Sequence, residues 1–117
     1  MNRIEYIPGD LVNTLFGIAK ITNVYKEGSY DFEGKSFSGS DTCEPIPLTP
    51  EILEKNGWKK TDATWIYKRE DSVTIFRLLD DKSYAAYIGN IRLLEFQFVH
   101  QLQHLLFGLG LDSNMIV

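Results

Sequence analysis

The sequence predicts an α+β protein in which an antiparallel meander of four strands lies between a short helix and a longer one. Three observations support this prediction. Thr49, Pro50 and Glu51 form a helix start. Four segments between residues 64 and 96 are rich in β-branched and aromatic residues and are separated by turn residues. Residues 98–110 have the apolar period of a helix.

A small antiparallel β lobe, residues 1–44, is expected before this part of the chain. The turn signal Pro8-Gly9-Asp10 comes before a short strand, and residues 16–25 carry the β-branched and aromatic residues of a longer one. Tyr30–Glu33 alternates apolar and acidic residues and turns at Gly34 into residues 36–38. The run Pro-Gly-Asp-Leu-Val followed by Gly-Ile-Ala-Lys-Ile resembles the start of an SH3-like small barrel. A plain antiparallel meander is the alternative.

The clearest boundary in the chain follows this lobe. Residues 44–48 (Glu-Pro-Ile-Pro-Leu) predict an extended connector, because each proline restrains the residue before it. Thr49 suits the N-cap of a helix over Pro50–Asn56, and Gly57 can close that helix in the left-handed conformation. We therefore divide the chain into a lobe of residues 1–44 and an α+β part of residues 45–117. The two parts can also share one core.

The meander has apolar side chains on both faces. Its four strands are expected at residues 64–69, 73–79, 84–88 and 91–96. Ile75 and Phe76 point to opposite faces of their strand, and so do Leu93 and Leu94. Either both faces are covered or β-bulges shift the alternation. We favour covering, with the last helix on one face and the amino-terminal lobe or a second subunit on the other.

The last helix carries the side chains that look most like a site. Its apolar stripe consists of Phe98, Val99, Leu102, Leu105, Leu106 and Leu109. His100, His104 and Phe107 fall together on the opposite face. Phe107 marks a partner surface, unless the carboxyl-terminal tail folds back over it. These three residues are our candidate binding residues.

His100 and His104 are also the candidate metal ligands. Histidines four residues apart on a helix can both reach one zinc ion, as in His-Glu-x-x-His metalloproteases. Here Gln101 replaces the glutamate, so the general base is missing, and no third ligand is obvious. The simpler interpretation is two surface histidines on the polar face of a core helix. We expect no cofactor.

Composition argues against several classes of function. The net charge is −4, and no run of Lys and Arg is longer than Lys59-Lys60, which disfavours nucleic-acid binding. Cys43 is the single cysteine and has acidic neighbours, so an inert thiol in a reducing compartment is expected. No signal peptide and no apolar run of about 20 residues is visible. We therefore expect a cytoplasmic protein that does not enter a membrane.

Two segments carry a resemblance to known proteins. Residues 44–58 (Glu-Pro-Ile-Pro-Leu-Thr-Pro-Glu-Ile-Leu-Glu-Lys-Asn-Gly-Trp) and 99–106 (Val-His-Gln-Leu-Gln-His-Leu-Leu) resemble a group of small uncharacterised proteins of gut bacteria and their phages or mobile elements. The resemblance brings no established activity and no catalytic residue. It implies a small accessory protein that acts by contacts.

The predicted function is therefore that of a non-enzymatic accessory protein, of phage or mobile-element origin, that acts through a protein–protein surface or by self-association. The alternative is a metal-binding protein or enzyme centred on His100 and His104. A third hypothesis is nucleic-acid binding through the SH3-like lobe.

Overall fold

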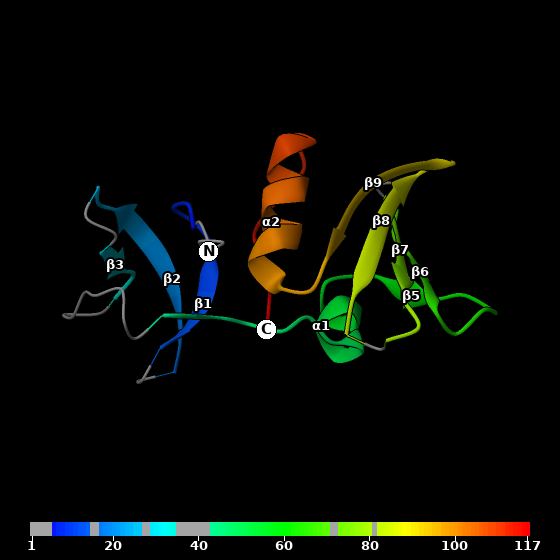
Figure 1. The fold of residues 1–117 in the computed structure, drawn as a ribbon, viewed down its shortest axis with the longest axis horizontal. Coiled ribbons are helices and arrows are strands. Elements are labelled where there is room, and N and C mark those ends of the chain that lie inside the picture. Colours follow the sequence, from blue (N-terminus) through cyan, green and yellow to red (C-terminus); the bar gives the residue numbers. More distant parts are fainter. Residues whose placement is uncertain (1–5, 15–16, 27–28, 35–42, 71–72, 81) are drawn as a thin grey trace.

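The fold is α+β, as predicted, with two antiparallel sheets and two helices (Figure 1). The computed structural model describes residues 6–14, 17–26, 29–34, 43–70, 73–80 and 82–117. The second helix, α2 (Val99–Gly108), stands between the two sheets. It contacts β1 (Leu11–Thr14) of the amino-terminal sheet on one side and β9 (Ile91–Phe96) of the carboxyl-terminal sheet on the other.

The amino-terminal sheet has the strand order β3-β2-β1-β4. Its other strands are β2 (Gly17–Val24), β3 (Tyr30–Phe32) and β4 (Glu44–Pro45). The strands bury a small cluster of apolar side chains: Tyr6, Val12, Ala19, Ile21, Tyr30 and Phe32. The strand expected at residues 36–38 lies outside the described residues. An SH3-like barrel stays a prediction, because the described strands form a four-stranded antiparallel sheet and establish no closed barrel.

Helix α1 (Pro50–Lys55) begins where its sequence predicts and ends one residue earlier, with Asn56 as its C-cap. The hydroxyl of Thr49 accepts a hydrogen bond from the Ile52 N–H at 3.2 Å. Gly57 has a φ of +93°, the left-handed conformation that glycine adopts without strain. These two residues limit the helix to fewer than two turns, and its Ile52 and Leu53 side chains are buried.

The carboxyl-terminal sheet is a meander with the order β5-β6-β7-β8-β9. The strands before β9 are β5 (Lys59–Lys60), β6 (Ile66–Lys68), β7 (Val73–Arg77) and β8 (Tyr84–Ile88). The four predicted strands are confirmed: β6 and β7 are shorter than predicted, β8 and β9 have the predicted bounds, and β5 is an addition. The inner face of this sheet carries Tyr67, Val73, Ile75, Tyr84, Ala86 and Phe96, which form the main core with α1 and α2.

The opposite face of this sheet, which we call the outer face, is covered by no described element (Figure 1). Both helices lie on the inner face, and the amino-terminal sheet lies beyond α2. The prediction that the amino-terminal lobe covers the second face is therefore wrong. The bulge explanation holds for β9, where Ala86 pairs with Leu94 and Tyr87 with Arg92, so that Leu93 is the extra residue.

The carboxyl-terminal residues 111–117 run as coil and connect parts of the fold that are distant in sequence. The Asn56 side chain donates to the Ile116 carbonyl at 2.7 Å and accepts from the Ile116 N–H at 2.8 Å. Asn56 also donates to the Ile52 carbonyl at 2.7 Å. One amide side chain thus joins the end of α1 to the tail.

Candidate functional site

The start of α2 explains why residue 101 is a glutamine. Its Oε1 accepts hydrogen bonds from the backbone N–H groups of Gln97 at 2.9 Å and Phe98 at 3.0 Å. Phe98 is the N-cap and has no side-chain acceptor of its own. Gln101 therefore satisfies backbone donors that the helix cannot reach. This residue, which stands where a metalloprotease has its glutamate, has a structural role here.

The polar face of α2 is not the exposed face that the sequence predicted. Val99, Leu102 and Leu106 are buried as expected, but His100 is only 4% exposed and Gln103 only 3%. The interpretation of His100 as a surface histidine is therefore wrong. Because a second sheet packs on this side, α2 buries most of its circumference.

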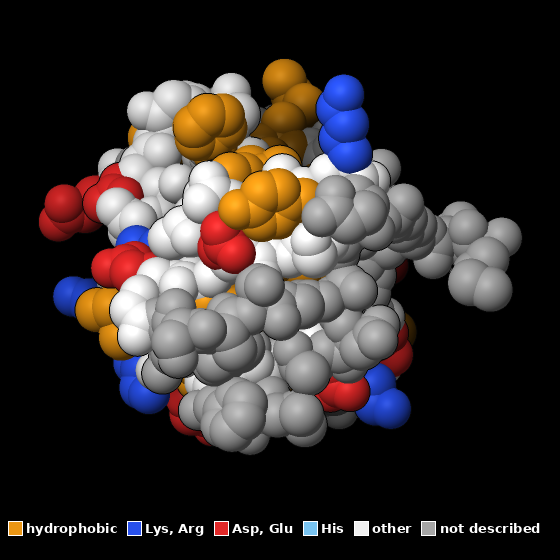
Figure 2. Space-filling model, turned by 90° about the vertical axis from the view of Figure 1, so that its left-hand side faces the viewer, with side chains coloured by type: hydrophobic (Ala, Val, Ile, Leu, Met, Phe, Trp, Pro, Cys, Tyr) orange, Lys and Arg blue, Asp and Glu red, His pale blue; other side chains and the backbone are white. Residues whose placement is uncertain are grey.

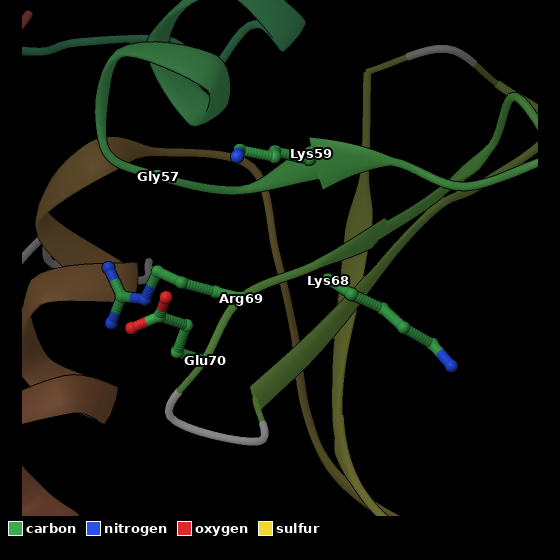
Figure 3. A pocket seen from close by; sticks show the side chains of 5 residues that line it. All are labelled: Gly57, Lys59, Lys68, Arg69 and Glu70. Carbon is green, nitrogen blue, oxygen red and sulfur yellow. The ribbon is translucent and has the colours of Figure 1, made fainter.

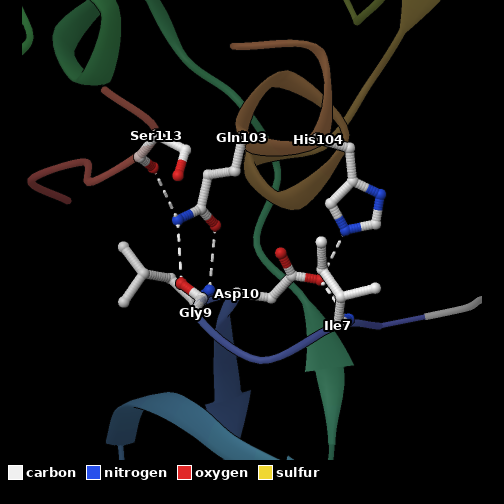
Figure 4. A network of polar contacts seen from close by, with 7 residues as sticks. Ile7, Gly9, Asp10, Gln103, His104 and Ser113 are labelled. Atoms are coloured by element: carbon white, nitrogen blue, oxygen red, sulfur yellow. Dashed lines mark hydrogen bonds and ion pairs between the residues drawn. The ribbon is translucent and has the colours of Figure 1, made fainter. Parts of the chain in front are cut away.

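Gln103 holds the amino-terminal sheet against α2 (Figure 4). Its Oε1 accepts from the Leu11 N–H at 2.9 Å, and its Nε2 donates to the carbonyls of Gly9 and Ser113, both at 3.1 Å. The side chain thereby joins β1, α2 and the tail. Gln103 was not among the predicted site residues. The available signal was a polar side chain at helical spacing from Val99 and Leu106.

Asp10 and His104 form a hydrogen-bonded pair beside Gln103 (Figure 4). The Asp10 Oδ2 lies 2.6 Å from the His104 Nε2 and also accepts from the Ile7 N–H at 2.9 Å. Burial raises the pKa of the Asp10 carboxyl, and the Ile7 and His104 hydrogen bonds oppose that rise. The pair joins the first turn of the lobe to α2 across 94 positions of sequence.

His100 lies one helical turn before His104 in more apolar surroundings. Its ring centroid is 4.9 Å from that of Tyr6 and 5.5 Å from that of His104. Burial, with a smaller effect of His104, lowers the pKa of His100 to about 4. Within the described residues, the His100 Nδ1 and the Tyr6 hydroxyl are buried without hydrogen-bond partners. Burial also raises the pKa of the Tyr6 hydroxyl.

The described part of the chain contains no group of three His, Cys, Asp or Glu side chains placed to hold a metal ion. The Nε2 of His104 is already hydrogen-bonded to the Asp10 carboxylate. Zinc binding by His100 and His104 stays a prediction. Burial raises the pKa of the Cys43 thiol to about 11, which opposes a role as nucleophile.

Phe107 is 67% exposed, so the tail does not cover it. The other two predicted binding residues are less accessible, because His100 is buried and His104 contacts Asp10. The three side chains therefore do not form one exposed surface. Phe107 by itself is accessible to a partner.

A hollow of about 650 Å³ lies where α1 leads into β5 and is lined by Gly57, Lys59, Lys68, Arg69 and Glu70 (Figure 3). The Arg69 guanidinium lies 3.6 Å over the Trp58 ring and donates to the Asn56 carbonyl at 3.1 Å. Lys59 and Lys68 point away from each other. Arg69 is thus engaged in contacts within the fold, and the two lysine side chains do not converge on one point.

The aromatic residues near these lysines mostly serve packing. Trp58 and Tyr67 are fully buried, and the Trp58 Nε1 donates to the Val73 carbonyl at 3.1 Å. Trp65 differs, because its side chain is 53% exposed. This leaves one tryptophan accessible just before β6, where it lines a second hollow.

A second hollow, of about 450 Å³, is lined mainly by apolar side chains at one end of the carboxyl-terminal sheet. Its lining residues are Thr64, Trp65, Phe76, Arg77, Leu78 and Leu79. Phe76 also belongs to the outer face, where its ring packs against that of Tyr87 with the ring centroids 4.7 Å apart. The register places Ile66 directly beside Phe76. The sequence predicted this two-sided apolar pattern, but not that the second face would remain uncovered.

The outer surface of the amino-terminal sheet carries hydrophobic, acidic and basic side chains (Figure 2). Among the residues drawn by type in that view, the lysines and arginines are scattered, and most of them lie near acidic side chains. Nucleic-acid binding through this lobe stays a prediction.

Comparison with protein-family models, with curated proteins and with solved structures gave no match. Among the described residues, no helix has the length and apolar character needed to span a bilayer.

Proposed function

We propose that the protein is a non-enzymatic accessory protein that binds another protein through the outer face and the adjoining apolar hollow. The observation that carries this proposal is a set of large apolar side chains, on one sheet, that no described element covers: Trp65, Ile66, Phe76, Leu78, Leu79 and Tyr87. Leu79 is fully exposed.

The chemistry of this surface suits a protein partner. Tryptophan, tyrosine and phenylalanine bury a large area with few rotatable bonds, which is why they dominate the binding energy of many interfaces. Charged and polar side chains surround the apolar centre on the same face, including Lys68, Arg92 and Glu95. An apolar centre with a polar rim is the usual anatomy of a protein interface.

The resemblance to small proteins of gut bacteria and their phages or mobile elements supports the same proposal. Such a protein is expected to act by contacts within a larger assembly. An SH3-like character of the amino-terminal lobe would supply a second contact surface and belongs to the same proposal.

Affinity capture from the native host tests the apolar hollow that adjoins the outer face. The wild type is compared with Trp65→Ser/Leu79→Ser, whose altered side chains are largely exposed and whose fold is checked by circular dichroism. Phe107→Ser, which removes an exposed aromatic side chain from α2, is the matched control. We expect a partner that is captured by the wild type and the control and is lost from the double variant. Loss in the control instead would move the proposed surface to α2.

The second candidate function is zinc binding at His100 and His104. Its supporting observation is that the two rings lie 5.5 Å apart and that the buried His100 Nδ1 lacks a partner among the described residues. Metal analysis of untagged protein and the melting temperature with added zinc test it. A stoichiometric metal that is lost in His104→Ala would support this function over the first.

A further inference from the structure

The two edges of the carboxyl-terminal sheet differ in how they are protected. One edge strand, β5, has two residues, Lys59 and Lys60. Short edges rich in lysine discourage pairing with another chain. The other edge strand, β9, has six residues and contains neither lysine nor proline. Only the β9 edge is therefore open to an added strand.

The strand β9 contacts α2, but among the described residues the backbone along its free edge is unpaired. In the part of the chain that the structure describes, no backbone hydrogen bond joins residues 91–96 to anything beyond β8. The neighbouring segment of the connector bonds only past the end of the strand, where the Leu48 N–H donates to the Gln97 carbonyl at 2.9 Å. Ile91 is 67% exposed and Leu94 is 40% exposed, so apolar area on this strand is left in water.

The sequence of β9, Ile-Arg-Leu-Leu-Glu-Phe, is complementary to itself when read in the opposite direction. In an antiparallel pair of two copies centred between Leu93 and Leu94, each Arg92 faces the Glu95 of the second copy. Leu93 then faces Leu94, and Ile91 faces Phe96. Opposite charges and apolar pairs across antiparallel strands both stabilise the pairing.

The bulge at Leu93 makes this pairing consistent with the two faces of the sheet. Arg92 pairs with Tyr87 and Glu95 with Ala85, so both charged side chains lie on the outer face. The Arg92–Glu95 ion pair within the chain, at 2.5 Å, confirms that they are neighbours there. Without the extra residue they would point to opposite faces. Residues directly opposite across strands must share a face, and the bulge provides this for both charged pairs.

We propose that two copies of this chain associate through antiparallel pairing of their β9 strands, in the register that sets Arg92 against Glu95 of the second copy. Ten strands then form one continuous sheet, and the two outer faces lie side by side. The pairing uses the β9 edge, which is the one unprotected edge of the carboxyl-terminal sheet among the described residues, so this sheet closes as a dimer and does not extend into a fibre. The pairing needs the backbone edge of β9 and the charges of Arg92 and Glu95, whereas the proposed function needs the apolar side chains of the outer face and the hollow, so different variants test the two proposals.

Charge reversal tests the register. Arg92→Glu sets two carboxylates against each other at both symmetric positions, and Glu95→Arg sets two guanidinium groups there. Each single variant is expected to weaken the dimer about tenfold or more. An equimolar mixture of the two variants restores both opposite-charge pairs and is expected to dimerise. The double variant Arg92→Glu/Glu95→Arg restores them within one chain.

Size exclusion with light scattering over a range of protein concentrations gives the readout. Lys59→Glu and Glu54→Arg are the matched controls. They change the net charge of the chain by the same amounts as Arg92→Glu and Glu95→Arg, but at positions far from β9. Circular dichroism checks the fold of every variant. A wild type that stays monomeric up to its solubility limit would overturn the proposal. Single variants that dimerise as strongly as the wild type would also overturn it. A third contrary result would be an equimolar mixture that stays monomeric although each single variant alone is monomeric.

Discussion

Gln103 is predicted to be the side chain on which the attachment of the amino-terminal sheet most depends. Replacing it by leucine keeps most of the side-chain volume and removes three hydrogen bonds, to the backbones of Gly9, Leu11 and Ser113. A neutral hydrogen bond contributes about 1 kcal/mol, and a buried donor left without a partner costs about 1–3 kcal/mol. The free energy of unfolding should therefore fall by about 2–4 kcal/mol.

That loss is a large part of the stability of a domain of this size, which is typically about 5–15 kcal/mol. Urea unfolding followed by circular dichroism measures it, and the melting temperature should fall by about 8–16 °C. Hydrogen exchange at the Leu11 amide reports the local effect, because this N–H loses its acceptor. Gln97→Leu is the control: that side chain is exposed and donates only to the Ser83 hydroxyl, at 3.2 Å. A loss below about 1 kcal/mol in Gln103→Leu would refute the inference that these bonds hold the two parts together.

Three further predictions concern pH, the tail and the end of α1. Because burial lowers the pKa of His100 from 6.5 to about 4, the unfolded chain binds the proton first. Stability should fall between pH 6.5 and 4 by at most about 3 kcal/mol, and the fall should be smaller in His100→Phe when both are unfolded by urea at each pH. Asn56→Ala removes both hydrogen bonds to Ile116, so hydrogen exchange at that amide should become faster and stability should fall by about 1–3 kcal/mol. Gly57→Ala places a Cβ 3.3 Å from the Arg69 Cδ at a φ of +93°, and thermal unfolding should show a loss of about 1–2 kcal/mol; an unchanged melting temperature would contradict that strain.

The sequence determined the local elements because their signals are local. Thr49, Pro50 and Gly57 bound α1 through hydrogen bonds and backbone conformations that need no distant residue. Alternating apolar residues between turns likewise predicted β6 to β9. The extra residue at Leu93 left a visible break in that alternation, although the pattern did not show whether a bulge or a second covering layer caused it.

The surroundings of α2 were decided only by tertiary structure. Helical spacing placed His100 and His104 near each other, but Asp10, the partner of His104, lies 94 positions earlier in the chain. Nothing in a single sequence shows which sheet packs on the second face of a helix, since that depends on contacts between distant segments. For this reason a face that looked polar and exposed is instead buried, and Gln103, His104 and Asp10 attach the amino-terminal sheet to it. The apolar face that remained in water belongs to the other sheet, because both helices pack on the same side of it.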